Sequence, residues 1–162
     1  MSELYRNLIE QYKSLIEGEK DFFVNASNLN ALLFNQIDNI NWVGFYMNDG
    51  SQLVLSTFQG KPACRRIEIG RGVCGKCAAH RKTLIVDNVH NFEGHIACDS
   101  ASNSEITIPL ILNNELYGVF DLDSPIFSRF TVDDNNGLED LLKILINGSD
   151  MNKLKNYYNI AN

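Results

Sequence analysis

The hydrophobic pattern of the chain changes its period once, near residue 41, and this change limits the folds that the chain can adopt. Residues 3–37 space their apolar side chains by three and four, as on one face of an α-helix, so we predict helices at 3–17 and 21–36. From Trp42 onward the pattern is that of short strands, beginning with the run WVGFY. Helices that precede a set of strands in this way predict an α+β domain.

Two hairpin signals organise the predicted sheet. We expect antiparallel hairpins at 42–58, turning at Asp49–Gly50, and at 105–123, turning at Asn113–Asn114. The shorter elements predicted between them are a strand at 67–69, a helix at 73–82 and a strand at 83–86. The sheet should therefore be mostly antiparallel, with the N- and C-terminal helices packed on one face.

We predict that residues 1–162 form one domain, because a chain of 162 residues is long enough for one core and too short for two comfortable ones. Its parts are N-terminal helices at 3–36, a sheet region with the candidate site at 41–131, and a C-terminal helix at 131–158. Thr131 is the expected N-cap of that last helix.

The charge of the chain excludes some classes of partner. The formal net charge is −6, whereas nucleic acids and anionic membranes both require a basic protein surface. The N-terminal sequence MSELYRNLIEQYKSLIEGEKD mixes both signs of charge without a long apolar run, so we predict neither a signal peptide nor a membrane span. We expect a cytoplasmic protein whose four cysteines are not permanent disulfides.

Cys74 and Cys77 form a Cys-x-x-Cys in the stretch GVCGKCAAH, three residues before His80. This spacing is typical of zinc sites and of redox dithiols. A structural zinc site needs four ligands, and a thioredoxin-like dithiol belongs to a βαβ unit, whereas this chain has one Cys-x-x-Cys between antiparallel hairpins. We therefore predict no metal site, and we interpret Cys77 as a small buried residue.

Cys98 lies in GHIACDSASNSEI, within an irregular stretch at 87–104. Loops of this length inside a compact domain are usually functional, and an exposed thiol near hydrogen-bond donors can ionise and act as a nucleophile. The residues alone leave two interpretations open, a nucleophilic Cys98 and a buried free thiol. We interpret His95 as a residue that structures the loop rather than as an activating base.

Three acidic residues are candidates for proton transfer. Asp121 and Asp123 share one face of their strand, because side chains alternate along a strand. A three-residue loop at 112–114 would place Glu105 opposite Asp121, whereas a two-residue turn would place the two on opposite faces, and the sequence leaves this geometry open. If the carboxylates converge, their repulsion raises at least one pKa and supplies a proton donor near neutral pH.

Trp42 and Tyr46 stand four residues apart on the first predicted strand, and therefore on one face of it. Aromatic side chains at this spacing can form the wall of a small pocket. They are equally consistent with an ordinary core.

Four stretches of the chain resemble the free methionine-(R)-sulfoxide reductases, a family with the GAF fold: NWVGFY, ACRRIEIGRGVCG, VDNVHNFEGHIACDSASNSEI and GVFDLDSP. The resemblance covers residues 41–131 and keeps together three cysteines that ordinary sensory GAF domains lack. The competing class is a GAF sensor without catalytic activity, which binds a small ligand and uses its cysteines as a redox switch.

The resemblance implies that the chain reduces free, not peptide-bound, methionine-(R)-sulfoxide to methionine. It implies that Cys98 is the catalytic nucleophile, Cys64 the resolving cysteine, Cys74 a further redox cysteine and Glu105 a catalytic acid. The substrate-binding residues that it implies are Trp42, Tyr46, Glu105, Asp121 and Asp123.

The implied cycle uses no cofactor and serves repair after oxidative stress. A sulfenic acid at Cys98 would condense with a second thiol to an intramolecular disulfide, which thioredoxin would reduce. The resemblance leaves open whether Cys64 or Cys74 is the main resolving thiol, and whether the terminal helices form a homodimer. The chain departs from the family at Cys77, where a small residue such as alanine is usual.

Overall fold

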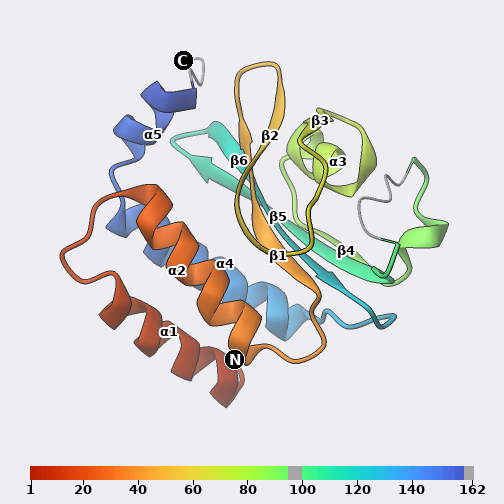
Figure 1. The fold of residues 1–162 in the computed structure, drawn as a ribbon, viewed down its shortest axis with the longest axis horizontal. Helices are drawn as coiled ribbons and strands as arrows, with labels where there is room; N and C mark the ends of the chain where they lie inside the picture. The colour runs from red at the N-terminus through yellow and green to blue at the C-terminus, as the bar shows by residue number, and fades with distance from the viewer. Residues whose placement is uncertain (95–99, 159–162) are drawn as a thin grey trace.

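A computed structural model describes residues 1–94 and 100–158 as one six-stranded sheet with helices on both faces (Figure 1). The helices are α1 (Glu3–Leu15), α2 (Phe22–Gln36), α3 (Gly72–His80), α4 (Val132–Gly148) and α5 (Met151–Tyr158), with a 3₁₀ turn, η1, at Val89–Asn91. The strands are β1 (Trp42–Asn48), β2 (Gln52–Gly60), β3 (Arg66–Glu68), β4 (Leu84–Val86), β5 (Ser104–Leu112) and β6 (Glu115–Ser124). No helix among the described residues is long and apolar enough to cross a membrane.

The strands lie in the order β3-β2-β1-β6-β5-β4, and each neighbouring pair is antiparallel. The helices α1, α2 and α4 form a layer on one face of this sheet, and α3 packs on the other face against β3, β5 and β6 (Figure 1). The prediction of an α+β domain with a mostly antiparallel sheet and its terminal helices on one face is confirmed.

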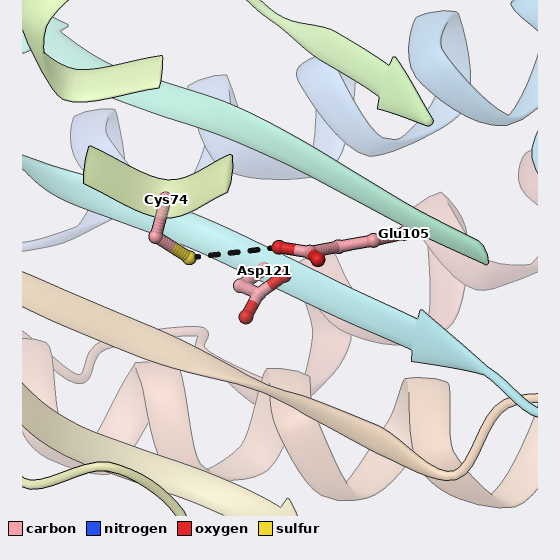
Figure 2. A group of neighbouring side chains, drawn as sticks. All are labelled: Cys74, Glu105 and Asp121. Atoms are coloured by element: carbon pink, nitrogen blue, oxygen red, sulfur yellow. Dashed lines mark hydrogen bonds between the residues drawn. The ribbon is translucent and has the colours of Figure 1, made fainter. Parts of the chain in front are cut away.

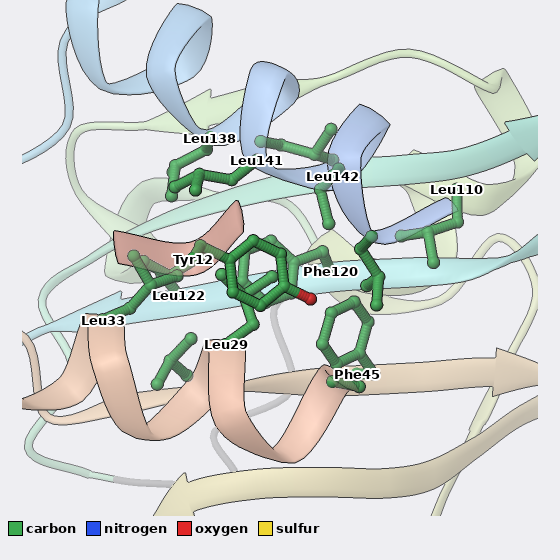
Figure 3. Packing of buried hydrophobic residues seen from close by; sticks show 14 of the residues in the cluster. Tyr12, Leu29, Leu33, Phe45, Leu110, Phe120, Leu122, Leu138, Leu141 and Leu142 are labelled. Carbon is green, nitrogen blue, oxygen red and sulfur yellow. The ribbon is translucent and has the colours of Figure 1, made fainter. Parts of the chain in front are cut away.

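The main core lies between the sheet and the layer of α1, α2 and α4 (Figure 3). On β6, Phe120 and Leu122 point into this core, where Leu29 of α2 and Leu141 of α4 meet them. Each such fully buried side chain contributes about 1.5–3 kcal/mol of transfer free energy. Because side chains alternate along β6, burying these apolar residues turns Asp121 to the opposite face, toward α3.

The C-terminal segment differs in one respect from the single helix expected at 131–158. Thr131 caps α4 as predicted, in a reciprocal capping box with Asp134. However, α4 ends at Gly148, and the Asp150 side chain accepts hydrogen bonds from two backbone N–H groups of the next turn. This second N-cap starts α5 as a separate helix.

A two-residue turn at Asn113–Asn114 joins β5 to β6, with φ angles of 51° and 63°. Positive φ at both central residues is typical of the turn that matches the twist of a hairpin. Beside this turn Leu112 pairs with Glu115. An uninterrupted ladder from that pair would place Glu105 opposite Leu122, on the face that contacts the main core.

A β-bulge at Leu110–Ile111 shifts this register by one residue. Beyond the bulge Glu105 pairs with Asp123, and Thr107 pairs with Asp121. Both predicted arrangements are therefore wrong in detail: Glu105 is not directly opposite Asp121, and the two-residue turn does not separate the two acids. The bulge returns the Glu105 side chain to the face that carries both aspartates.

Candidate active site

A small cavity lies on the sheet face that α3 covers, and its volume is about 40 Å³. It is lined by Trp42, Tyr46, Pro62, Ala63, Ile67, Arg71, Gly72, Val73, Cys74, Ser102, Glu105, Asp121 and Asp123. Pockets for drug-sized ligands are typically about 300–1,000 Å³, so this one suits a compact molecule. All five residues predicted to bind substrate lie in this lining.

Trp42 and Tyr46 form an aromatic wall of the cavity. Their rings stack with centroids 5.8 Å apart, and Trp42 also stacks on Phe58 at 5.4 Å. Gly44 lies between them on β1, where a Cβ would come within 2.4 Å of the Cβ of Phe58. The two rings are 3% and 2% exposed, so the pocket and core interpretations of these aromatics are both correct.

The polar atoms of the same two rings hold the segment that carries Cys64. Trp42 Nε1 donates to the Lys61 carbonyl at 3.1 Å, and Tyr46 Oη donates to the Cys64 carbonyl at 2.9 Å. Cys64 is in a disulfide, whereas Cys74 and Cys77 are free thiols. The wall of the cavity therefore also fixes the backbone of a disulfide-bonded cysteine, next to the lining residue Ala63.

Glu105, Asp121 and Cys74 meet at one side of the cavity, from β5, β6 and α3 (Figure 2). The Cys74 thiol donates to Glu105 Oε1 at 3.9 Å. The Cys74 sulfur and one carboxylate oxygen from each of the two acids all lie within 4.8 Å of one another. The two acids are each 6% exposed. Such burial is uncommon for carboxyl groups, so the pair requires a chemical explanation.

Burial is the main cause of the raised pKa of both acids. It raises the pKa of Asp121 to about 7. The pKa of Glu105 is raised well above its ordinary value by burial and then by the charges of Asp121 and Asp123. Because the two acids interact, their titration belongs to the pair, and both shifts favour the protonated form. A carboxylic proton donor requires a shift in this direction, so these surroundings favour the predicted role of Glu105, which stays a prediction.

Cys74 is positioned by the sequence GVCG at the start of α3. The glycine after it, Gly75, packs against β3, where a Cβ would lie 2.4 Å from the Glu68 carbonyl oxygen. The thiol is 4% exposed, and burial followed by the neighbouring acid charges raises its pKa well above the ordinary value. A thiol in these surroundings stays protonated, which does not suit an attacking nucleophile.

Cys98 and His95 lie outside the described residues, so the predicted nucleophile and its neighbour have no described geometry. The chain enters this stretch after Gly94 and leaves it at Ser100. Ser102, just beyond it, lines the cavity and accepts a hydrogen bond from Asn41 Nδ2 at 3.1 Å. The end of the predicted catalytic loop is therefore anchored at the cavity.

Comparison with known proteins assigns the chain to a family. The family model of the GAF domain matches residues 29–142. The chain is 47% identical over 141 residues to the free methionine-R-sulfoxide reductase of Escherichia coli K12, which covers 87% of this chain and 86% of that protein. The chain belongs to the free methionine-R-sulfoxide reductase family of GAF domains.

Solved structures of this family have the same fold. The chain matches the reduced form of fRMsr from Staphylococcus aureus with a TM-score of 0.86 and 46% identity, over 89% of this chain and 94% of that one. It matches the free methionine-R-sulfoxide reductase of Neisseria meningitidis, in complex with its substrate, with a TM-score of 0.85 and 40% identity. That match covers 89% of this chain and 87% of the Neisseria chain.

Cys77 is a buried free thiol, as predicted. It is 0% exposed in the small core beneath α3, and burial raises the pKa of its thiol to about 12. A cysteine in this state packs as a small apolar residue. The Cys-x-x-Cys therefore combines one thiol that lines the cavity with one thiol that does not.

We expect Cys77→Ala to leave kcat/KM for the sulfoxide within about twofold of wild type. The substitution removes only the buried Sγ atom, so the cavity that it leaves is far smaller than the cavity left when a leucine or phenylalanine is truncated to alanine. Steady-state kinetics at matched protein concentration test this. A loss of most activity would contradict the assignment of Cys77 to packing.

Arg71 and Ser102 line the cavity but were not among the predicted site residues. Arg71 is the N-cap of α3 and lies in RGVCG, three residues before Cys74. Its position in a motif that was already singled out is the signal that could have identified it. Ser102 lies within the stretch GHIACDSASNSEI, which was also singled out, three residues before Glu105.

Proposed function

We propose that this chain reduces free methionine-(R)-sulfoxide to methionine. The observation that carries the proposal is the buried pair of Glu105 and Asp121 beside the aromatic wall of Trp42 and Tyr46. A sulfoxide presents a polar oxygen that must accept a proton and a methyl group that prefers an apolar surface. The cavity offers both partners, and the substrate complex of the Neisseria relative supports the same assignment.

In the first step of the proposed cycle, the Cys98 thiolate attacks the sulfoxide sulfur. Glu105 delivers a proton to the sulfoxide oxygen, the S–O bond of the substrate breaks, and the oxygen passes to Cys98 as a sulfenic acid. The substrate gains two electrons and leaves as methionine, while Cys98 loses two. The raised pKa of Glu105 supports this role, because a donor must still be protonated at neutral pH.

In the second step the Cys64 thiol attacks the sulfenic sulfur of Cys98, water leaves and a disulfide forms. A thioredoxin dithiol then reduces this disulfide in the cytoplasm and restores both thiols. The disulfide state of Cys64 supports its assignment as the resolving cysteine. Cys74, a free thiol beside Glu105, is the alternative resolving cysteine.

Selectivity for the free amino acid follows from the carboxylates that do not carry the transferred proton. Asp123 pairs with Glu105 across the sheet and lines the cavity, so it offers a negative charge to the ammonium group of the substrate. A methionine sulfoxide within a peptide has no such ammonium group. The small volume of the cavity also disfavours a chain that continues on both sides of the side chain.

The proposal is tested with purified protein and dithiothreitol on three substrates. Free methionine-(R)-sulfoxide should be consumed. Free methionine-(S)-sulfoxide, which has the opposite configuration at sulfur, and N-acetyl-methionine-(R)-sulfoxide, which has no ammonium group, should each be turned over at least about a hundredfold more slowly. Absence of methionine from the first substrate would refute the function. Equal rates with the acetylated substrate would refute the role of the ammonium group.

We expect Cys64→Ser to release one methionine per enzyme and then stop with thioredoxin as the reductant, because attack by Cys98 precedes resolution. Single-turnover measurement of methionine by quenched flow separates the two steps. A missing first turnover would show that Cys64 acts earlier than proposed. Continued cycling would identify Cys74 as the resolving thiol, and the Cys64→Ser/Cys74→Ser double variant should then stop after one turnover.

A further inference from the structure

The proposed cycle uses the acids for proton transfer but gives no primary role to the thiol between them. Cys74 Sγ lies 3.9 Å from Glu105 Oε1, and these atoms and a carboxylate oxygen of Asp121 are all within 4.8 Å of one another (Figure 2). One thiol and two carboxylates converge here from three different elements, and each of these donor types binds Zn²⁺ in proteins.

A second observation indicates that this cluster is incomplete without a ligand. Asp121 is 6% exposed and lines the cavity, yet its Oδ1 is buried with no hydrogen-bond partner among residues 1–94 and 100–158. Leaving a buried polar atom without a partner costs about 1–3 kcal/mol, and more for a charged group. A cation bound between the three side chains would remove this cost.

We propose that Cys74, Glu105 and Asp121 bind one divalent cation of borderline or soft character, with Zn²⁺ as the physiological candidate. In a tetrahedral zinc site with Zn–S of about 2.3 Å and Zn–O of about 2.1 Å, sulfur and oxygen ligands are about 3.6 Å apart. The 3.9 Å separation of Sγ and Oε1 is close to that value. The fourth position faces the cavity and would hold water.

The ligand set also discriminates between metals. Mg²⁺ requires six oxygen ligands in near-octahedral geometry, and Ca²⁺ takes six to eight, whereas this cluster offers a sulfur and few oxygens. Binding involves no change of oxidation state: the cation takes the place of the protons on the Cys74 thiol and on the carboxyl groups, which pass to solvent. Asp123, also in the lining, adds negative charge nearby.

The metal and the substrate would occupy the same groups. A cation on Glu105 and Asp121 removes the proton donor and fills the space in front of the aromatic wall, so it would exclude methionine sulfoxide from the cavity. This consequence rests on the proposed function, and the metal site itself does not. The site would therefore act as a reversible, metal-dependent block of the reductase.

The test uses Cd²⁺ as a spectroscopic probe on the disulfide form of the protein, prepared with an oxidant that is then removed. In this form, with the proposed Cys64–Cys98 disulfide, thiol titration should find Cys74 and Cys77 free. Wild type should bind one Cd²⁺ with a thiolate-to-metal charge-transfer band in the ultraviolet. Cys74→Ser should lose the band, the matched Cys77→Ala should keep it, and Glu105→Gln should weaken binding at least tenfold.

The outcomes separate the metal site from the reductase. Failure of wild type to give the band, or a band that Cys77→Ala abolishes and Cys74→Ser retains, would overturn the metal site. Free methionine-(R)-sulfoxide should weaken Cd²⁺ binding by competition. If Cd²⁺ binds through Cys74 and the sulfoxide does not compete, the metal site stands and the placement of substrate at these acids is overturned.

Discussion

Cys98→Ser is expected to abolish turnover of free methionine-(R)-sulfoxide even with excess dithiothreitol, because a serine hydroxyl cannot replace the sulfur that attacks the substrate. The loss should exceed about a thousandfold, on the order of 4 kcal/mol in the activation barrier. Reductant cannot rescue this variant, since the block precedes the disulfide. The measurement is methionine formed per enzyme over a long incubation, by chromatography.

Cys77→Ser provides the matched control for this experiment, because it makes the same atomic change at a thiol that does not line the cavity. Thermal unfolding of both variants separates lost chemistry from lost fold. Activity of Cys98→Ser within about tenfold of wild type, or about 1.4 kcal/mol, would remove Cys98 from its assigned role. The attack on the sulfoxide sulfur would then belong to another thiol of the chain.

Local pattern in the sequence was sufficient to predict much of this architecture. The alternation in GVFDLD places Phe120 and Leu122 in the main core and Asp121 on the other face, because the period of a strand is two. Thr131 caps α4 through a side chain only three residues from its partner. Such features depend on neighbours in the chain, and a sequence contains that information directly.

The meeting of Glu105 with the aspartates could not be predicted in the same way. The turn at Asn113–Asn114 can be predicted from the sequence, but a two-residue turn on its own would place the Glu105 side chain on the wrong face of the sheet. The bulge at Leu110–Ile111 corrects the register, and nothing in the turn residues themselves indicates that a bulge will follow. A register set by packing on both faces is not encoded in any single stretch of sequence.

The raised pKa values depend on the folded state for the same reason. Clustering of like charges was the predicted cause, yet burial is the larger cause for both Glu105 and Asp121. Burial of these carboxyl groups requires α3 to cover the sheet, which brings Cys74 against them. The sequence identified which residues titrate, and only the packing of α3 determines how far their pKa values move.

Glu105→Gln is expected to lower kcat about 10²- to 10⁴-fold, because the amide retains the shape of the side chain but cannot deliver a proton. The single-turnover rate of methionine release should fall by the same factor, since proton transfer belongs to the reductive step. Thioredoxin-dependent reduction of the disulfide form should remain normal. A normal first turnover in Glu105→Gln would contradict the assignment of Glu105 as the proton donor.

The pH profile of Asp121→Asn gives an independent test of the same donor. The protonated form of Glu105 is present below its pKa and is lost as the pH rises through it, so this pKa limits activity on the alkaline side. After burial, the charge of Asp121 is the largest cause that raises this pKa. Asparagine removes that charge, so the pKa of Glu105 falls and the alkaline limb of kcat/KM should move to lower pH.

Asp123→Asn is the matched comparison, because Asp123 raises the pKa of Glu105 less than Asp121 does. Its alkaline limb should move in the same direction by a smaller amount, while its KM should rise if Asp123 binds the ammonium group. In Glu105→Gln the limb should disappear, since the titrating donor is gone. An alkaline limb that stays in place in all three variants would show that another group protonates the sulfoxide oxygen, although the buried pair lines the cavity.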